Sequence, residues 1–206
     1  STIFRQDEWF LYVLWIFQEK LQAEYCKTYL CPQQGLCQVQ FLFHDEDFLR
    51  TAGVSAALNE VTLAQLKQMD VGSWFSRDFA GERVPTFTET VACLLQHNLT
   101  ANIEIKAVVG FEVQTVEALV PLLEEWPKAL VPPIISSFSE DALRLCQRLF
   151  PQGQYAVLWY QLPVHWLALA TDLEVTDIHL HEKNVTKAVA EQIIHGGFNL
   201  RCYTVN

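Results

Sequence analysis

Apolar and polar positions follow two different periods along the second half of the chain, which has 206 residues. Short runs rich in β-branched and aromatic residues have the pattern of buried strands, and the amphipathic segments between them have the period of helices. Strands are expected at 101–106, 133–138, 155–160, 176–181 and 200–206. Helices are expected at 61–69, 85–99, 113–126, 140–150, 163–173 and 185–197. This alternation, with short connections, predicts a parallel sheet covered by helices.

Local signals place the ends of several helices. Thr62 and Ser139 are expected as N-caps, because their side-chain oxygens can accept hydrogen bonds from unpaired backbone N–H groups. Pro163 is expected at the start of its helix, where the missing N–H has no role. Gly196 or Gly197 is expected to end the last helix.

The run Phe41 to Phe43 adds one more expected strand, which ends at His44. Periodicity alone leaves two arrangements open, a (β/α)8 barrel, which typically needs about 250 residues, and an open doubly wound sheet. No glycine-rich phosphate-binding loop follows any expected strand, which argues against a dinucleotide-binding domain.

Charge and composition narrow the choice of partner. The net charge is −10 and there is no long basic run, which argues against nucleic acid as a partner. The apolar run 10–17 is too short to cross a bilayer, which takes about 20 residues. The six cysteines are too scattered for a small disulfide scaffold, so a reducing cytoplasm is the expected location.

The strand at 101–106 carries the most informative polar pattern. Successive side chains point to opposite faces of a strand, so Glu104 and Lys106 share one side with Asn102. If helices cover the other face, the Glu and Lys point into the sheet's interior, where a charge must be paired or bound. Glu104 suits Mg²⁺ or Ca²⁺, and Lys106 suits a phosphate oxygen. A solvent-facing strand and a structural Glu–Lys pair remain alternatives.

Three further positions are candidates for chemistry or binding. His44, at the end of its strand, is either catalytic or a hydrogen-bonded surface residue. His179 and His181 share one strand face and could bind a metal ion if further ligands join them. Trp74 and Phe75, in a loop after a glycine, either pack in the core or line a substrate pocket.

Six segments in order resemble the bacterial cytosolic glycerophosphodiester phosphodiesterases, which are TIM-barrel enzymes. They are FLFHDEDFLRT, VTLAQLKQMDVGSWFS, FAGERVPTFTETV, ANIEIK, PPIISSFSEDAL and LRCYTVN. The resemblance implies metal-dependent hydrolysis of glycerophosphodiesters, a step of lipid and glycerol metabolism, to glycerol 3-phosphate and an alcohol. It also implies that His44 is catalytic, that Glu104 binds the divalent cation, and that Lys106 binds phosphate.

The resemblance begins near residue 39, and residues 1–38 form an atypical segment. The family's N-terminal His-Arg-Gly is absent, and Tyr29 and Cys31 stand where its Glu-x-Asp metal pair is expected. The family's closing strand is also absent. The implied fold at 39–206 is therefore a truncated, incomplete TIM barrel with its first and last strands missing or replaced. Two other functions stay open, a catalytically inactive binding protein and a different metal-dependent hydrolase that uses His179 and His181.

Overall fold

The computed structural model describes residues 28–29, 41–43, 45, 47–57, 61–106, 110 and 112–203. The chain divides into two compact units. The first comprises Ser1–Ala101 with Trp126–Pro132, and the second comprises Asn102–Glu125 with Pro133–Asn206. Each unit is described separately below, through those of its residues that the structure describes.

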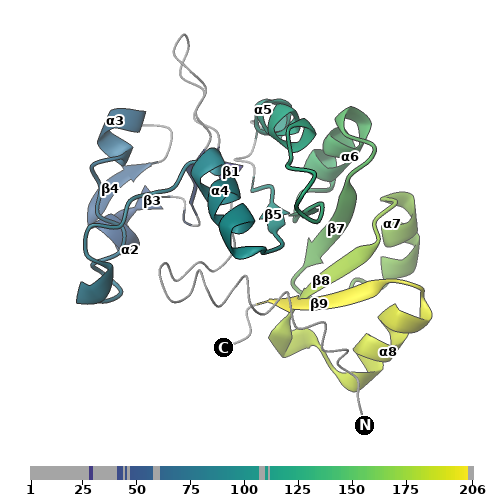
Figure 1. Cartoon of the computed structure of the whole chain (residues 1–206). Helices are drawn as coiled ribbons and strands as arrows, with labels where there is room; N and C mark the ends of the chain where they lie inside the picture. Colours follow the sequence, from purple (N-terminus) through teal and green to yellow (C-terminus); the bar gives the residue numbers. More distant parts are fainter. Residues whose placement is uncertain are drawn as a thin grey trace. The chain divides into compact units, whose positions relative to one another are not determined.

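The second unit is built on a five-stranded parallel sheet. Its strands lie in the order β5 (Asn102–Glu104), β6 (Ile134–Ser137), β7 (Gln154–Trp159), β8 (Asp177–His181) and β9 (Asn199–Tyr203). The helices that connect them are α5 (Glu112–Glu124), α6 (Glu140–Leu149), α7 (Trp166–Asp172) and α8 (Lys187–His195), and they lie along one side of the sheet (Figure 1). The expected alternation of strands and helices is confirmed for this part of the chain.

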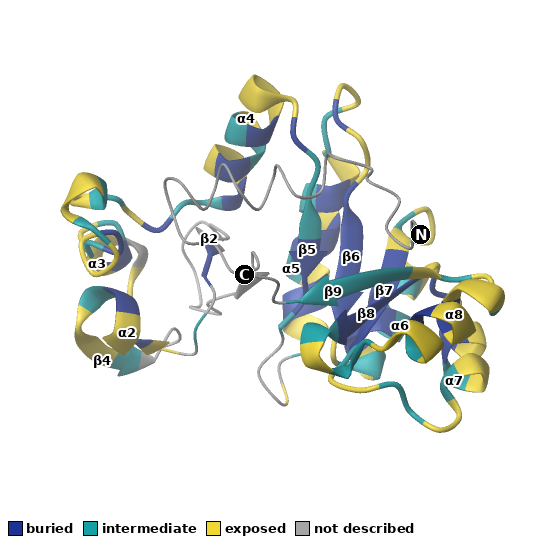
Figure 2. Ribbon diagram, turned by 90° about the horizontal axis from the view of Figure 1, so that it is seen from below, coloured by how far each residue is buried: buried dark blue, intermediate teal, exposed yellow. Residues whose placement is uncertain are grey.

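Burial explains why these apolar runs form strands. The sheet is dark with buried residues over most of β5 to β8 (Figure 2), and such near-continuous burial is typical of parallel strands. Ile135, Val157, Ile178 and Leu180 are completely buried. Their neighbours along the strands point to the opposite face, where Glu104 stands level with Ser136, Ala156, Asp177 and Asn199 in the strand register.

The sheet is strongly curled. Phe138 directly follows β6 and Tyr203 ends β9, three strands away in the sheet order. Strands three places apart in a flat sheet are separated by about 14 Å, but the centroids of these two rings are 5.7 Å apart. The carboxyl ends of the strands therefore converge, as they do in part of a closed barrel.

The ends of the helices follow the sequence with one correction. Ser139 caps α6 by accepting a hydrogen bond from Ala142 N at 3.2 Å. The prediction that Pro163 starts the next helix is wrong, because Trp166 N donates to Pro163 O at 3.1 Å in a turn and α7 begins at Trp166. α8 ends as expected: Gly196 is its C-cap, and Gly197 follows with φ of 88°, which glycine adopts most freely.

The first unit has two short antiparallel strand pairs. β1 (Thr28–Tyr29) pairs with β2 (Phe41–Leu42), and β3 (Asp47–Phe48) pairs with β4 (Val54–Ala57). The strand expected to end at His44 corresponds to β2, whose described partner is antiparallel, and His44 itself lies outside the described residues. The described helices of this unit are α2 (Leu49–Ala52), α3 (Leu63–Leu66), the 3₁₀ turn η2 (Arg77–Phe79) and the longer α4 (Phe87–His97).

A small apolar cluster joins α4 to the segment Trp126–Pro132. Leu94, Leu99 and Leu130 are buried together, and Trp126 packs against them. The Trp126 ring also makes an edge contact with Phe87 at a centroid distance of 6.2 Å. This segment follows α5 of the second unit in sequence, yet its side chains contribute to the core of the first unit.

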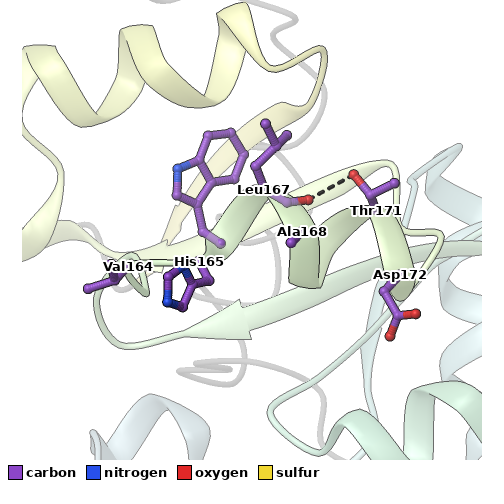
Figure 3. A pocket seen from close by; sticks show the side chains of 7 residues that line it. Val164, His165, Leu167, Ala168, Thr171 and Asp172 are labelled. Atoms are coloured by element: carbon purple, nitrogen blue, oxygen red, sulfur yellow. Dashed lines mark hydrogen bonds between the residues drawn. The ribbon is translucent and has the colours of Figure 1, made fainter.

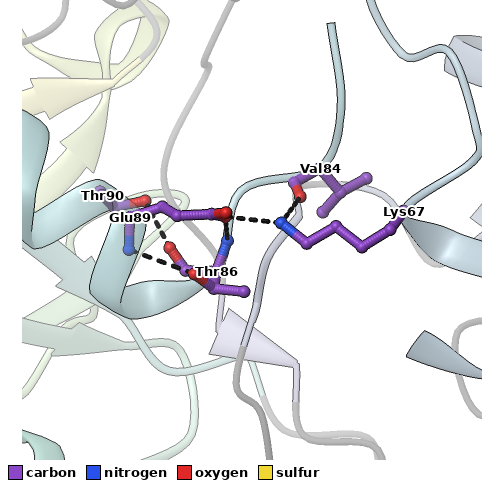
Figure 4. Close-up of polar contacts among 5 residues, drawn as sticks. All are labelled: Lys67, Val84, Thr86, Glu89 and Thr90. Carbon is purple, nitrogen blue, oxygen red and sulfur yellow. Dashed lines mark hydrogen bonds and ion pairs between the residues drawn. The ribbon is translucent and has the colours of Figure 1, made fainter. Parts of the chain in front are cut away.

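The start of α4 is fixed by a capping box (Figure 4). Thr86 Oγ1 accepts a hydrogen bond from Glu89 N at 3.1 Å, and Glu89 Oε2 accepts one from Thr86 N at 2.7 Å. Lys67 Nζ approaches the same carboxylate at 2.6 Å and also donates to Val84 O. Lys67 first, and then the Thr86 backbone, lower the pKa of Glu89 to about 2.

Replacing Thr86 with alanine should destabilise the protein, because Glu89 N would lose its only capping acceptor in this box. The expected cost is about 1 kcal/mol, measured as a lower midpoint in urea unfolding at neutral pH. Thr88→Ala, at an exposed position two residues along the same helix, is the matched control and should change the midpoint much less. Equal effects of the two substitutions would contradict the assigned role of the box.

Candidate active site

Glu104 and Lys106 stand at the carboxyl end of β5, which two serines of β6 hold in place. Ile105 N donates to Ser136 O at 2.7 Å, and Ser137 Oγ donates to Ile105 O at 2.6 Å. These bonds extend the pairing beyond the last residue of β5. As a result Glu104 is only 2% exposed, while Lys106 is half-buried. The alternative of a solvent-facing strand is therefore wrong for Glu104.

The charge on Glu104 acts on Tyr203 at the end of β9. Burial first, and then the negative charge of Glu104, raise the pKa of Tyr203 to about 12. The phenol therefore stays protonated at neutral pH, and its hydroxyl donates to Trp159 O at 3.0 Å. The Glu104 carboxylate at the end of β5 is therefore close enough to the Tyr203 phenol at the end of β9 to influence its protonation.

A polar network that the sequence did not predict lies lower on the same face. Asp177, at the start of β8, is buried and accepts hydrogen bonds from Arg201 Nε at 2.8 Å, from Thr176 Oγ1 at 2.7 Å and from Asn199 Nδ2 at 3.3 Å. The sequence does show polar residues alternating with apolar ones in β8 and β9. Pairing Asp177 with Arg201 and Asn199, however, requires the register between the two strands. A buried carboxylate with three donors is a structural element rather than a free reactive group.

His179 and His181 lie in different surroundings, although they share a face of β8. His179 is buried, and its Nε2 has no hydrogen-bond partner within the described part of the chain. His181 is half-buried between the rings of Tyr160 and Tyr203. Among the described residues, no group of three or more His, Cys, Asp or Glu side chains could hold a metal ion. The described ligands thus give the pair no metal site.

Burial gives His179 an unusual titration. Burial away from water is the main cause that lowers the pKa of His179 from 6.5 to about 4. The negative charge of Asp177 opposes this shift, and the positive charge of Arg201 adds to it. The folded state therefore binds fewer protons than the unfolded state when the pH falls below 6.5. The contribution of neutral His179 to the free energy of unfolding is therefore fully present above pH 6.5, and it is lost as the pH falls toward 4.

Replacing His179 with leucine or with glutamine should remove this pH dependence. In the wild type, the free energy of unfolding should fall between pH 6.5 and pH 4. Both variants should show a shallower decline over that interval, since neither side chain takes up a proton on unfolding. Urea unfolding at a series of pH values measures the slopes. Slopes as steep as that of the wild type in both variants would show that folded His179 binds its proton as readily as the unfolded residue.

Trp74 and Phe75 belong to the first unit and stand in a loop that Asp70 organises. The Asp70 carboxylate accepts bonds from the N–H groups of Gly72, Ser73 and Gly81 and from the Ser73 hydroxyl, and these hold its pKa far below the usual range. Trp74 and Phe75 are 38% and 40% exposed. The alternative that both are core residues is therefore wrong.

The Trp74 ring is nevertheless held in a defined position. Its Nε1 donates to Val71 O at 2.9 Å, and the guanidinium of Arg50 lies over the ring at 4.5 Å from the centroid. Arg50 in turn binds Asp45 at 2.7 Å. The loop thus presents an ordered aromatic surface, and its use as a pocket wall stays a prediction.

One hollow of the second unit lies apart from these residues. It has a volume of about 630 Å³ and lies along α7, lined by Val164, His165, Trp166, Leu167, Ala168, Thr171 and Asp172 (Figure 3). Thr171 Oγ1 donates to Leu167 O at 2.7 Å, within the helix itself. Asp172, its one carboxylate, is bound by Arg144. None of the expected site residues lines this hollow.

Comparisons with known proteins assign the chain to a family. The model of the glycerophosphoryl diester phosphodiesterase family matches residues 38–206. A glycerophosphodiester phosphodiesterase of Caldanaerobacter subterraneus subsp. tengcongensis is 28% identical over 166 residues, which are 80% of this chain and 68% of that protein.

Solved structures agree with this assignment. An Oleispira antarctica phosphodiesterase in complex with the product sn-glycerol-3-phosphate matches with a TM-score of 0.81 and 26% identity, over 95% of this chain and 78% of that one. The glycerophosphodiester phosphodiesterase of Agrobacterium tumefaciens, at 18% identity, matches with a TM-score of 0.66 over 95% of this chain and 80% of its own. At that identity, the second match supports the fold alone.

The chain therefore belongs to the glycerophosphoryl diester phosphodiesterase family, a family of phosphoric diester hydrolases. The resemblance seen in the sequence motifs is confirmed, and so is the α/β fold with an incomplete barrel sheet. In the described residues, no helix is long and apolar enough to span a membrane. The division at residue 38 stays a prediction, as do the roles of His44, Glu104 and Lys106.

Proposed function

We propose that this chain hydrolyses glycerophosphodiesters to glycerol 3-phosphate and an alcohol. The observation that carries the proposal is the buried carboxylate of Glu104 at the end of a parallel strand, with Lys106 two residues further on. Active sites of barrel enzymes are built at the carboxyl ends of the strands. Membership of the family and the match to a structure that contains sn-glycerol-3-phosphate support the same substrate class.

Each proposed residue has a task in this reaction. Water adds to phosphorus while the bond from phosphorus to the alcohol oxygen breaks. The leaving alkoxide must gain a proton and the attacking oxygen must lose one. His44 would serve one of these two transfers, as acid or as base. Lys106 offsets the negative charge on the phosphoryl oxygens. Trp74 and Phe75 are proposed to contact the substrate through apolar surface.

The family generally depends on a divalent cation, and the described residues fit that requirement only in part. Glu104 supplies one buried oxygen ligand of the kind that Mg²⁺ and Ca²⁺ prefer. The described side chains form no complete set of ligands around it. Glu104 is accordingly proposed as one ligand, and the cation, when bound, would neutralise charge on the phosphate.

The cytoplasm is the proposed location. Cys93, Cys146 and Cys202 are free thiols in the structure. Burial raises the pKa of the Cys146 and Cys202 thiols, which lowers their reactivity. Reduced, unreactive cysteines are typical of proteins in a reducing compartment.

The purified chain should release glycerol 3-phosphate from glycerophosphocholine when Mg²⁺ or Ca²⁺ is present. His44→Gln should lower kcat by roughly 10²–10⁴-fold because it removes an acid–base group. Glu104→Gln and Lys106→Met should also abolish most of the release, and chelation of the metal should do the same. A coupled assay for glycerol 3-phosphate measures each rate.

Glu117→Gln, at an exposed position on α5, is the matched control for Glu104→Gln and should keep the wild-type rate. Far-UV circular dichroism should establish that each variant is folded. If the folded wild type releases no glycerol 3-phosphate with either metal, the alternative of a catalytically inactive binding protein replaces the proposal. Activity that survives Glu104→Gln but fails in His181→Gln would favour the hydrolase based on His179 and His181.

A further inference from the structure

Four aromatic side chains gather where the strands of the second unit end. Phe138 follows β6, Tyr160 follows β7, His181 is the last residue of β8, and Tyr203 is the last residue of β9. We call these four residues the strand-end cluster. They come from positions as far apart as 65 residues in sequence (138 to 203), and the curl of the sheet brings them together.

The rings form a continuous series of contacts. The centroid distances are 5.7 Å from Phe138 to Tyr203, 5.5 Å from Tyr203 to His181 and 4.8 Å from His181 to Tyr160. The first two pairs meet nearly edge to face, at interplanar angles of 88° and 78°. Rings at such angles present faces in several directions rather than one flat stack.

The two ends of the series are more open to solvent than the middle. Phe138 is 50% exposed and Tyr160 is 60% exposed, while His181 and Tyr203 are half-buried. Tyr160 is held in place all the same, because its carbonyl accepts a hydrogen bond from Asn184 Nδ2 at 2.7 Å. Apolar groups that are exposed side by side, unlike single exposed residues, are typical of binding sites.

Carboxylates stand beside this cluster. Glu182 Oε2 lies 3.2 Å from His181 Nδ1, and the charge of Glu182 also contributes to the raised pKa of Cys202. The charge of Glu104 acts on Tyr203. Ring faces and nearby carboxylates both attract a cation, and a ring face does so without a hydrogen bond from that cation.

We propose that the strand-end cluster binds a quaternary ammonium group on the alcohol half of the substrate. This inference rests on the proposed function, since it names the head group that the phosphodiester would carry. A primary ammonium gives up hydrogen bonds to water where ring faces surround it, and that loss costs free energy. A quaternary ammonium group has no N–H to satisfy and needs only aromatic ring faces and a negative potential, which the cluster supplies.

Direct binding separates the charge of the ligand from its shape. Choline and its neutral isostere 3,3-dimethylbutan-1-ol have the same size, but only choline carries a charge. Titration calorimetry on the intact wild-type chain should show choline binding about tenfold more tightly than the isostere. Equal affinities, or no binding of choline, would overturn the proposal.

Variants test whether the four rings are responsible. Tyr160→Ala and Phe138→Ala should each weaken choline binding by about fivefold and leave the isostere nearly unaffected. Tyr160→Phe keeps the ring and should keep the affinity. Leu167→Ala, at an exposed apolar position on α7 outside the cluster, is the control and should change nothing. Choline affinity that survives both alanine variants would overturn the assignment of the site.

A rate comparison separates failure of this inference from failure of the proposed function. The wild type should favour glycerophosphocholine over glycerophosphoethanolamine in kcat/KM, and Tyr160→Ala should reduce that ratio toward one. Release of glycerol 3-phosphate with no preference between the two head groups would contradict the binding of quaternary ammonium at the cluster, and the proposed hydrolase function would stand. Choline binding without any release would sink the proposed function and leave the binding site intact.

Discussion

The hydrogen bonds between the end of β5 and the two serines of β6 are the constraint on which the candidate site depends. Ser136 and Ser137 are completely buried, and their backbone and side-chain oxygens bind the N–H and the C=O of Ile105. A strand of three residues has little pairing of its own. With these bonds, the segment that carries Glu104 and Lys106 stays extended. These bonds thereby keep the Glu104 carboxylate buried, although burial of a charged group costs free energy.

Curvature is the second requirement, and it acts at longer range. Parallel strands place their carboxyl ends at one edge, but only a curled sheet makes that edge concave. The contact between the rings of Phe138 and Tyr203 joins the ends of β6 and β9, which are three places apart in the sheet. Below them, Asp177 ties the last two strands together through Arg201 and Asn199. Polar links low in the sheet and aromatic links at its rim thus act on the same strands.

Much of the second unit could be read from the sequence because its signals are local. Ser139 caps a helix through atoms three residues away, and the strand alternation put Glu104 on the face opposite Ile103 and Ile105. Pro163 misled because proline suits a turn before a helix as well as the first turn inside it. The motifs that identify the family are also local runs of residues.

What the sequence could not supply was the register between distant strands. The bond between Asp177 and Arg201 joins residues 24 positions apart, and its existence depends on how β8 and β9 align. The strand-end cluster depends further on the curl of four strands, which no single run encodes. The desolvation that depresses the pKa of His179 has the same origin, since its burial comes from neighbours in other strands.

The path of the chain through the short segment Trp126–Pro132 limits how the protein can be divided. The polypeptide leaves the second unit after α5, adds Trp126 and Leu130 to the apolar cluster of the first unit, and returns to form β6. The indole N–H of Trp126 also bonds Val131 O within the excursion. No single cut therefore separates the two units, and a fragment beginning at Asn102 would carry Trp126 and Leu130 stripped of the α4 residues that cover them. Such a fragment would have to hide that apolar surface in new contacts, with itself or with other copies.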